Sequence, residues 1–356
     1  MEITIREVAA ADRKPRPEGT ALGFGQLFTD HMFVMPYDAE QGGWHDPEVR
    51  PYANFSLDPA AMVFHYGQAI FEGLKAYRGD NGAVHLFRPG ANIERMNVSA
   101  TRLCMPTLPQ ETALAGLRAL VRLDAAWVPS SPGATLYIRP TMVATEAALG
   151  VRPARQYLFF IIMSPVGAYY PEGFNPVRIY VTDQYVRAVP GGVGAAKAAG
   201  NYAASIRAAE EAKKNGFTQV LWLDACERRY VEEVGTMNIF FAIGDEVITP
   251  PLAGSILPGI TRDSVLRLIR EWGYRVVERP IGIDEVLAAG KSGELKEAFG
   301  TGTAAVISPV GALHYKGQDC VINSGKTGSL SQRLFDELQA IQYGRARDPF
   351  GWVETL

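Results

Sequence analysis

Cysteine is scarce in this chain of 356 residues, and its few thiols lie far apart. Cys104, Cys226 and Cys320 are odd in number, so they cannot all pair in a disulfide framework. Their spacing also lacks the close Cys and His pairs of a metal site. We therefore predict three free thiols and no bound metal.

A surplus of one charge sign is also missing, and so are long hydrophobic runs. The 35 basic and 38 acidic residues give a net charge of −3, without a basic stripe that would attract nucleic acid or an anionic membrane. The apolar run 157–163 is too short to cross a bilayer, and the N-terminus does not resemble a signal peptide. These absences predict a cytoplasmic protein with no nucleic-acid or membrane partner.

The most informative segment present is 191–202, where Lys197 stands in a run of glycine and alanine. Small neighbours allow a flat ring to approach the backbone, and a lysine placed there can form a Schiff base with a carbonyl compound. A phosphate-binding loop is an alternative, because a strand-like run (177–181) precedes the segment and a helical pattern (201–215) follows it. That alternative lacks the Ser or Thr expected directly after the lysine. A flexible loop is the third interpretation.

A pyridoxal phosphate site also requires an acid for the ring nitrogen. Glu233 precedes the apolar strand 239–243, and a carboxylate there could keep the pyridine nitrogen protonated. The alternative is that Glu232 and Glu233 form a solvated pair.

Phosphate binding is the next requirement. Residues 265–272 carry an apolar helical face that ends at Gly273, and this helix begins after Pro258 and Gly259. Backbone N–H groups of Ile260 and Thr261 at such a helix start suit a phosphate dianion. An ordinary threonine cap is the alternative.

A strand around residues 135–145 offers a receptor for a carboxylate. Side chains alternate across a strand, so Leu136 and Ile138 are predicted to face the core while Tyr137 and Arg139 share the other face. The planar fork of an arginine binds carboxylates well. A surface arginine without a ligand is the alternative.

Taken in order, these segments resemble the branched-chain amino acid aminotransferases, which are fold-type IV pyridoxal-phosphate enzymes. The resemblance covers almost the whole chain and includes Phe71-Glu72-Gly73 and Leu136-Tyr137-Ile138-Arg139-Pro140. It implies an α/β (α+β) protein with a small N-terminal α/β domain and a larger C-terminal pseudo-barrel domain. The mammalian members carry a CxxC redox pair where this chain has Ala305 and Ser308. The matching segments are 24–32, 65–77, 87–104, 136–140, 165–170, 191–202, 233–238, 257–261 and 299–304.

The resemblance also implies a role for each matching residue. Lys197 would be the catalytic base and would hold pyridoxal 5′-phosphate, with Glu233 at the ring nitrogen and Tyr202 at the phenolic oxygen. Further cofactor contacts would come from Arg95, Thr236, Ile260, Thr261 and Thr303. Substrate contacts would come from Phe24, Tyr66, Phe71, Tyr137, Arg139, Tyr169, Thr303 and Ala304.

The implied activity is reversible, ping-pong transfer of an amino group between L-leucine, L-isoleucine or L-valine and 2-oxoglutarate, by a homodimer. D-Amino acid aminotransferases and aminodeoxychorismate lyases share the lysine and the glutamate, so both stay open as alternatives. A catalytically silent cofactor-binding regulatory protein is a rival of another class.

Composition and turn residues predict the domain organisation. We expect an N-terminal arm (1–22), a small α/β domain (23–170), a connector (171–182) and a large cofactor-binding domain (183–356). Predicted strands 73–78 and 83–87 flank a Gly79-Asp80-Asn81-Gly82 hairpin turn, and strands 135–145 and 157–164 follow. Predicted helices cover 93–104, 112–127 and 330–343.

Overall fold

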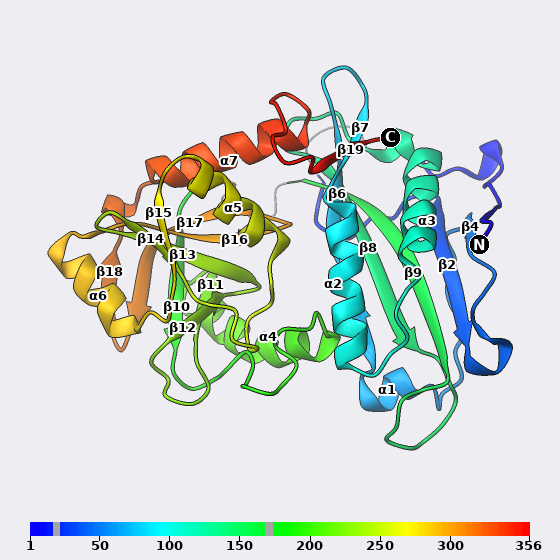
Figure 1. The fold of residues 1–356 in the computed structure, drawn as a ribbon, viewed down its shortest axis with the longest axis horizontal. Coiled ribbons are helices and arrows are strands. Elements are labelled where there is room, and N and C mark those ends of the chain that lie inside the picture. The colour runs from blue at the N-terminus through cyan, green and yellow to red at the C-terminus, as the bar shows by residue number, and fades with distance from the viewer. Residues whose placement is uncertain (17–21, 168–173) are drawn as a thin grey trace. The chain divides into compact units, whose positions relative to one another are not determined.

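The computed structural model describes residues 1–16, 22–167 and 174–356, which divide into two compact units (Figure 1). Unit 1 comprises Met1–Tyr169, Ala196–Ala199 and Ala340–Leu356, and unit 2 comprises Tyr170–Ala195 and Gly200–Gln339. No helix in the described ranges is long and apolar enough to span a membrane.

Unit 1 is built on a sheet in which all pairings are antiparallel except that of β1 with β4. β3 (Gly43–Trp44) pairs with β2, and β5 (Ala69–Phe71) pairs with β8. The remaining strands follow the order β1 (Thr4–Ile5), β4 (Glu48–Pro51), β2 (His31–Asp38), β9 (Gln156–Val166), β8 (Thr135–Ala144), β6 (Leu74–Arg78), β7 (Val84–Phe87) and β19 (Val353–Thr355).

Helices α2 (Pro89–Arg102) and α3 (Gln110–Leu123) supply apolar residues to the core of this unit, and the short helix α1 (Met62–Tyr66) precedes β5. Leu136 and Ile138 of β8 are fully buried in that core together with Leu117 and Leu120 of α3. The other face of β8 therefore carries Tyr137 and Arg139, as the alternation predicts.

Unit 2 contains a closed ring of six strands. These are β10 (Val177–Thr182), β11 (Gln219–Leu223), β12 (Val231–Val234), β13 (Met237–Ile243), β16 (Leu295–Gly302) and β17 (Val306–Tyr315), and pairing of β12 with β13 closes the ring. β14 (Glu246–Thr249), β15 (Arg275–Glu278) and β18 (Gln318–Val321) extend the sheet beyond it. The helices are α4 (Ala199–Lys214), α5 (Ile260–Glu271), α6 (Ile283–Ser292) and α7 (Ser329–Gln342).

The predicted α/β architecture and its elements are confirmed. Strands β6 and β7 flank the predicted Gly79–Gly82 turn, in which Gly82 has a φ of 82°. Helix α7 buries Leu330, Leu334, Leu338 and Ile341, the four residues whose spacing predicted it. The predicted helix 112–127 ends earlier, at Leu123, and a 3-10 turn covers Ala125–Trp127.

The domain limits differ from the predicted ones in several places. The strand-like run predicted at 177–181 is confirmed as β10, so the predicted connector (171–182) extended too far into unit 2. The apolar residues of β10 are buried between the parallel neighbours β11 and β17. In the predicted arm, Thr4–Ile5 pairs with β4. Two segments predicted in the large domain, Ala196–Ala199 and Ala340–Leu356, belong to unit 1, the latter because β19 pairs with β7.

Candidate active site

The backbone around Lys197 is fixed within unit 1 by three contacts. The Lys197 N–H group donates to Ser99 Oγ of α2 at 2.9 Å, and the Lys197 carbonyl accepts from the N–H group of Phe71 at 3.1 Å. Ala198 pairs with Ile70 as an isolated bridge next to β5. The lysine is therefore held by structure and is not part of a flexible loop.

The Lys197 amine lies among charged and aromatic groups. Its Nζ atom is 4.9 Å from the centre of the Phe71 ring. Desolvation, followed by the charge of Arg95, lowers the pKa of Lys197 to about 8, although Glu72 and Tyr137 oppose this shift. At neutral pH, far more of this amine is neutral than of an ordinary lysine with a pKa of 10.5, as a general base requires.

Arg95 is a predicted phosphate ligand, and in the structure its guanidinium binds Glu72. Arg95 Nε donates to Glu72 Oε1 and Arg95 Nη2 donates to Glu72 Oε2, both at 2.8 Å. The Glu72 side chain is fully buried, and that of Arg95 is 10% exposed. This pair places opposite charges beside the lysine.

The predicted substrate residues Tyr137, Arg139, Phe71 and Phe24 come together in unit 1. Arg139 Nη2 donates to the Tyr137 hydroxyl at 3.0 Å, and the Arg139 guanidinium carbon lies 4.6 Å from the centre of the Phe71 ring. The rings of Phe24 and Tyr137 meet edge to face at 5.0 Å. A cation bordered by aromatic faces suits both a carboxylate and an apolar side chain.

The other predicted substrate residues lie on other segments of the chain. Tyr66 lies at the end of α1 with 39% of its surface exposed, and its ring is 6.1 Å from that of His65. Tyr169 lies outside the described residues. Thr303 and Ala304 occupy the turn between β16 and β17 of unit 2 and are partly buried.

Glu233 lies on β12 and is 2% exposed. It forms an ion pair with Arg187, and its Oε1 accepts from Asn238 Nδ2 at 3.0 Å and from the Leu257 N–H group at 3.2 Å. The carboxylate is thus held by donors from three segments of unit 2. Glu232 is also buried and accepts from the Ser255 hydroxyl, so the alternative of a solvated glutamate pair is wrong.

Helix α5 begins as its sequence predicts. Gly259 is the N-cap residue, with φ −70° and ψ 131°, and no side chain caps the helix. The alternative in which a threonine side chain serves as the cap is therefore wrong. Ile260 and Thr261 are the first two helical residues, where N–H groups have no intrahelical acceptor. The positive end of the helix dipole would favour an anion there.

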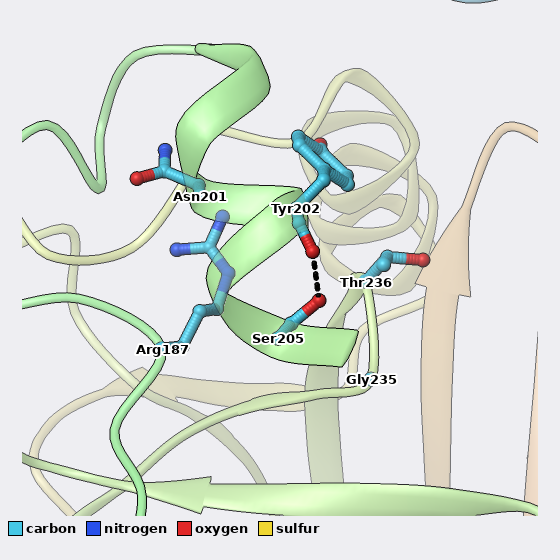
Figure 2. A pocket seen from close by; sticks show the side chains of 6 residues that line it. All are labelled: Arg187, Asn201, Tyr202, Ser205, Gly235 and Thr236. Atoms are coloured by element: carbon cyan, nitrogen blue, oxygen red, sulfur yellow. Dashed lines mark hydrogen bonds between the residues drawn. The ribbon is translucent and has the colours of Figure 1, made fainter. Parts of the chain in front are cut away.

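A small pocket in unit 2 is lined by two predicted cofactor residues, Tyr202 and Thr236 (Figure 2). Tyr202 comes from α4, and Thr236 follows Gly235 in the turn between β12 and β13. Gly235 has a φ of 57°, and a Cβ atom there would lie 2.2 Å from Gln219 Oε1, so the turn requires glycine. Arg187, Asn201 and Ser205 complete the lining.

These groups fit pyridoxal phosphate by their chemistry. The cofactor requires a neutral lysine, a buried acid for the ring nitrogen and donors for a dianion. Within unit 1, the Lys197 amine has a lowered pKa. Within unit 2, Glu233 is a buried acid and the start of α5 presents backbone N–H groups. The Thr301 hydroxyl oxygen, near the end of β16 and two residues before Thr303, is buried without a hydrogen-bond partner.

Comparison with known proteins decides the family. The model of the amino-transferase class IV family matches residues 69–313. Branched-chain-amino-acid aminotransferase 2 of Bacillus subtilis is 54% identical over 353 residues, which cover 99% of this chain and 97% of that protein. Branched-chain-amino-acid transaminase 1 of the same organism is 56% identical over 96% of each chain. This chain is a branched-chain amino acid aminotransferase of class IV.

Solved structures of this aminotransferase family share the fold. The Escherichia coli branched-chain amino acid aminotransferase superposes with a TM-score of 0.75 at 25% identity, covering 91% of this chain and 98% of that chain. The branched-chain amino acid aminotransferase of Thermobaculum terrenum, in its PLP-form, gives a TM-score of 0.74 at 22% identity, covering 93% of this chain and 99% of that chain.

Sequence analysis of this aminotransferase did not reveal the side chains that pair with two predicted site residues, Glu233 and Arg95. Arg187 and Glu233 stand far apart along the chain, and no short motif connects the two. Glu72 belongs to a segment that matches the family, but only the structure shows that it binds Arg95. Both are contacts between distant segments, which periodicity and local spacing do not reveal.

Proposed function

We propose that this aminotransferase transfers amino groups reversibly between L-leucine, L-isoleucine or L-valine and 2-oxoglutarate, with pyridoxal 5′-phosphate as cofactor. The observation that carries the proposal is the Lys197 amine, which is held by backbone contacts on both sides and has a pKa lowered to about 8. When bound, the cofactor supplies a reactive aldehyde and a ring that withdraws electrons.

Lys197 is the attachment point of the cofactor and the base of the reaction. Once the amino group of the substrate has displaced Lys197 from the cofactor, the neutral Nζ atom would remove the proton from the substrate Cα atom and carry it. Burial and the nearby Arg95 charge keep the amine ready for this role, since both disfavour its protonated form.

The other predicted cofactor residues would hold pyridoxal phosphate and keep its ring nitrogen protonated. Glu233 would face the ring nitrogen, and its hydrogen bonds with Asn238 and Leu257 hold its carboxylate in place. The Tyr202 hydroxyl would bind the phenolic oxygen, and Thr236 would line the ring. Arg95, Ile260, Thr261 and Thr303 would bind the phosphate, with Ile260 and Thr261 acting through backbone N–H groups at the start of α5.

One substrate pocket accepts two kinds of side chain in turn. As the family resemblance implies, Phe24, Tyr66, Phe71, Tyr137 and Tyr169 would form its apolar wall, while Arg139 would bind the distal carboxylate of glutamate. The hydrogen bond from Arg139 to the Tyr137 hydroxyl supports a polar end of the pocket formed by these two side chains. Backbone N–H groups of the turn with Thr303 and Ala304 bind the α-carboxylate.

We further propose a cytoplasmic homodimer. Support for the dimer comes from apolar side chains exposed at one place in unit 1. Met62 of α1 donates its N–H group to the Glu146 carbonyl at 2.9 Å, and Ala61 bridges to Ala147. The exposed apolar residues near these contacts are Phe64 (62%), Tyr66 (39%), Leu149 (71%) and Val151 (89%). Exposed apolar groups gathered in this way mark interaction surfaces.

An amino-transfer assay with purified protein tests the activity. With L-leucine and 2-oxoglutarate, we expect 4-methyl-2-oxopentanoate and glutamate in equal amounts. D-Alanine in place of leucine should give no glutamate, which separates this activity from that of a D-amino acid aminotransferase. A protein that binds the cofactor but forms neither product would be the silent regulatory rival, and the proposal would be wrong.

A further inference from the structure

The carboxylate of Glu72 is among the most deeply buried charges of unit 1. It lies between β5 and β6, and its own backbone N–H group donates to the Pro140 carbonyl at 2.8 Å. The Gly73 N–H group donates to Glu72 Oε2 at 3.2 Å. These contacts fix the position of the carboxylate relative to β8, the strand of Tyr137 and Arg139.

The fixed carboxylate in turn fixes Arg95. Two parallel hydrogen bonds of 2.8 Å, from Nε and Nη2, determine both the plane and the rotation of the guanidinium. One helical turn later, Ser99 Oγ donates to the Arg95 carbonyl at 3.1 Å and accepts from the Lys197 N–H group. A single turn of α2 thus connects the Glu72–Arg95 pair with the backbone of the reactive lysine.

The Glu72–Arg95 pair also contributes to the electrostatic environment of the Lys197 amine. The groups that act on the Lys197 amine are Arg95 from α2, Glu72 after β5, and Tyr137 and Arg139 from β8. Arg95 and Arg139 lower the pKa of Lys197, whereas Glu72 and Tyr137 raise it. Because the pair is buried, solvent screens these charges poorly.

We infer that Glu72 is a positioning residue of the reaction, which orients Arg95 toward the cofactor phosphate and offsets the Arg95 charge beside Lys197. This inference rests on the proposed function, since Arg95 is assigned there to the phosphate. Glu72 acts through Arg95 and Lys197 and does not need to touch the substrate.

Substitution Glu72→Gln keeps the shape of the side chain but removes its charge and one of its acceptor oxygens. Arg95 would then lose its fixed orientation and would act on the amine without compensation. We expect a lower pKa for Lys197 and weaker binding of pyridoxal phosphate. Glu94→Gln, on the exposed side of the same helix, is the matched control.

The test uses cofactor-free protein, so it needs no transaminase activity. Competitive acetylation between pH 6 and 10, read by mass spectrometry of the peptide with Lys197, gives the labelling midpoint. We expect a midpoint near pH 8 for the wild type and for Glu94→Gln, and one about 1 pH unit lower for Glu72→Gln. An unchanged midpoint in Glu72→Gln would overturn the inference.

Arg95→Met completes the cycle. Arg95→Met alone should raise the labelling midpoint of Lys197. In the double variant Glu72→Gln/Arg95→Met both charges are absent, so the midpoint should return close to the wild-type value. If Glu72→Gln alone does not fold, the comparison of Arg95→Met with the double variant decides, because these two proteins differ only in the charge of residue 72. Equal midpoints in these two proteins would contradict the role of Glu72.

Equilibrium dialysis of pyridoxal phosphate is the second readout. Glu72→Gln should raise the dissociation constant about tenfold, while Glu94→Gln should leave it unchanged. If these shifts appear in a protein that does not transaminate leucine, the proposed function fails, and only the role of Glu72 in cofactor binding and in the charge near Lys197 stands. Cofactor affinity that is the same in both variants would contradict the orientation of Arg95 by Glu72.

Discussion

Two buried lysines of unit 1 show how burial tunes an amine at the residue scale. Lys197 and Lys75 both have a pKa of about 8, where an ordinary lysine has 10.5, and desolvation is the leading cause for each. Lys75 lies on β6 opposite Tyr137 and is 7% exposed. In the folded state both amines release their protons more easily than in the unfolded chain.

This difference predicts a pH dependence of stability for Lys75. Between pH 8 and 10.5 the unfolded chain binds more protons than the folded protein, so the cost of burying this lysine falls as pH rises. Relative to Lys75→Met, the wild type should therefore gain about 1–2 kcal/mol in the free energy of unfolding from pH 7 to pH 9.5. Urea unfolding of both proteins at the two pH values measures it, with Lys213→Met on α4 as control. A difference that stays constant with pH would refute the prediction.

Arg139 should separate the two substrates of the reaction. Its guanidinium is expected to bind the distal carboxylate of glutamate, which leucine lacks. Arg139→Gln should lower kcat/KM for glutamate about 100-fold and that for leucine less than tenfold, since a charge-assisted bidentate contact is worth about 2–3 kcal/mol. Single half-reactions with each amino acid measure the two values separately. Equal losses for both substrates would point to a structural role for Arg139.

At the scale of elements, the start of α5 allows a single backbone N–H group to be removed and its binding role tested. Ile260 is the first helical residue, a position where proline is well tolerated, and proline removes the N–H group. Ile260→Pro should keep the helix but weaken binding of pyridoxal phosphate about tenfold or more, by loss of one hydrogen bond to a charged group.

Ile260→Ala is the matched control, because it shortens the same side chain and keeps the donor. We expect near-normal cofactor affinity for Ile260→Ala, measured by dialysis, and similar helical circular dichroism for both variants. Equal cofactor affinity in the two variants would show that the Ile260 N–H group does not bind the phosphate.

Local sequence patterns predicted the helices and strands better than the contacts between side chains of distant segments. Alternation placed Tyr137 and Arg139 on one face of β8, and glycine marked the start of α5, because both effects act within a few residues. The connection of Glu233 with Arg187 and that of Glu72 with Arg95 depend on how distant segments fold together. Strand β10 was predicted in part as a connector because the preceding prolines and glycine are typical of a loop, whereas buried parallel pairing makes it a strand.

At the scale of the whole molecule, the two units protect their sheet edges differently. The open sheet of unit 1 ends in the short strands β1 and β19, while the six-stranded ring of unit 2 is closed by pairing of β12 with β13. Short edges and closure both limit uncontrolled pairing with other chains. The exposed apolar residues in and near α1 do not belong to the edge strands of unit 1, so an interface there would form by side-chain packing and not by strand addition.

The proposed dimer can be tested on this surface. Leu149→Asp combined with Val151→Asp places two charges among its most exposed apolar residues and should convert the dimer to a monomer. Light scattering coupled to size-exclusion chromatography measures the mass. Val98→Asp, at another exposed site on α2, should leave the dimer intact. A wild type that is monomeric at micromolar concentration would exclude the proposal.

Attachment of pyridoxal phosphate to Lys197 is the event on which the assigned roles depend. Borohydride reduction of the cofactor-loaded protein, followed by peptide mapping, identifies the modified lysine. We predict a reduced phosphopyridoxyl group on the peptide with Lys197 and none in Lys197→Ala. A modification on Lys75 alone, or no modification after incubation with the cofactor, would contradict it.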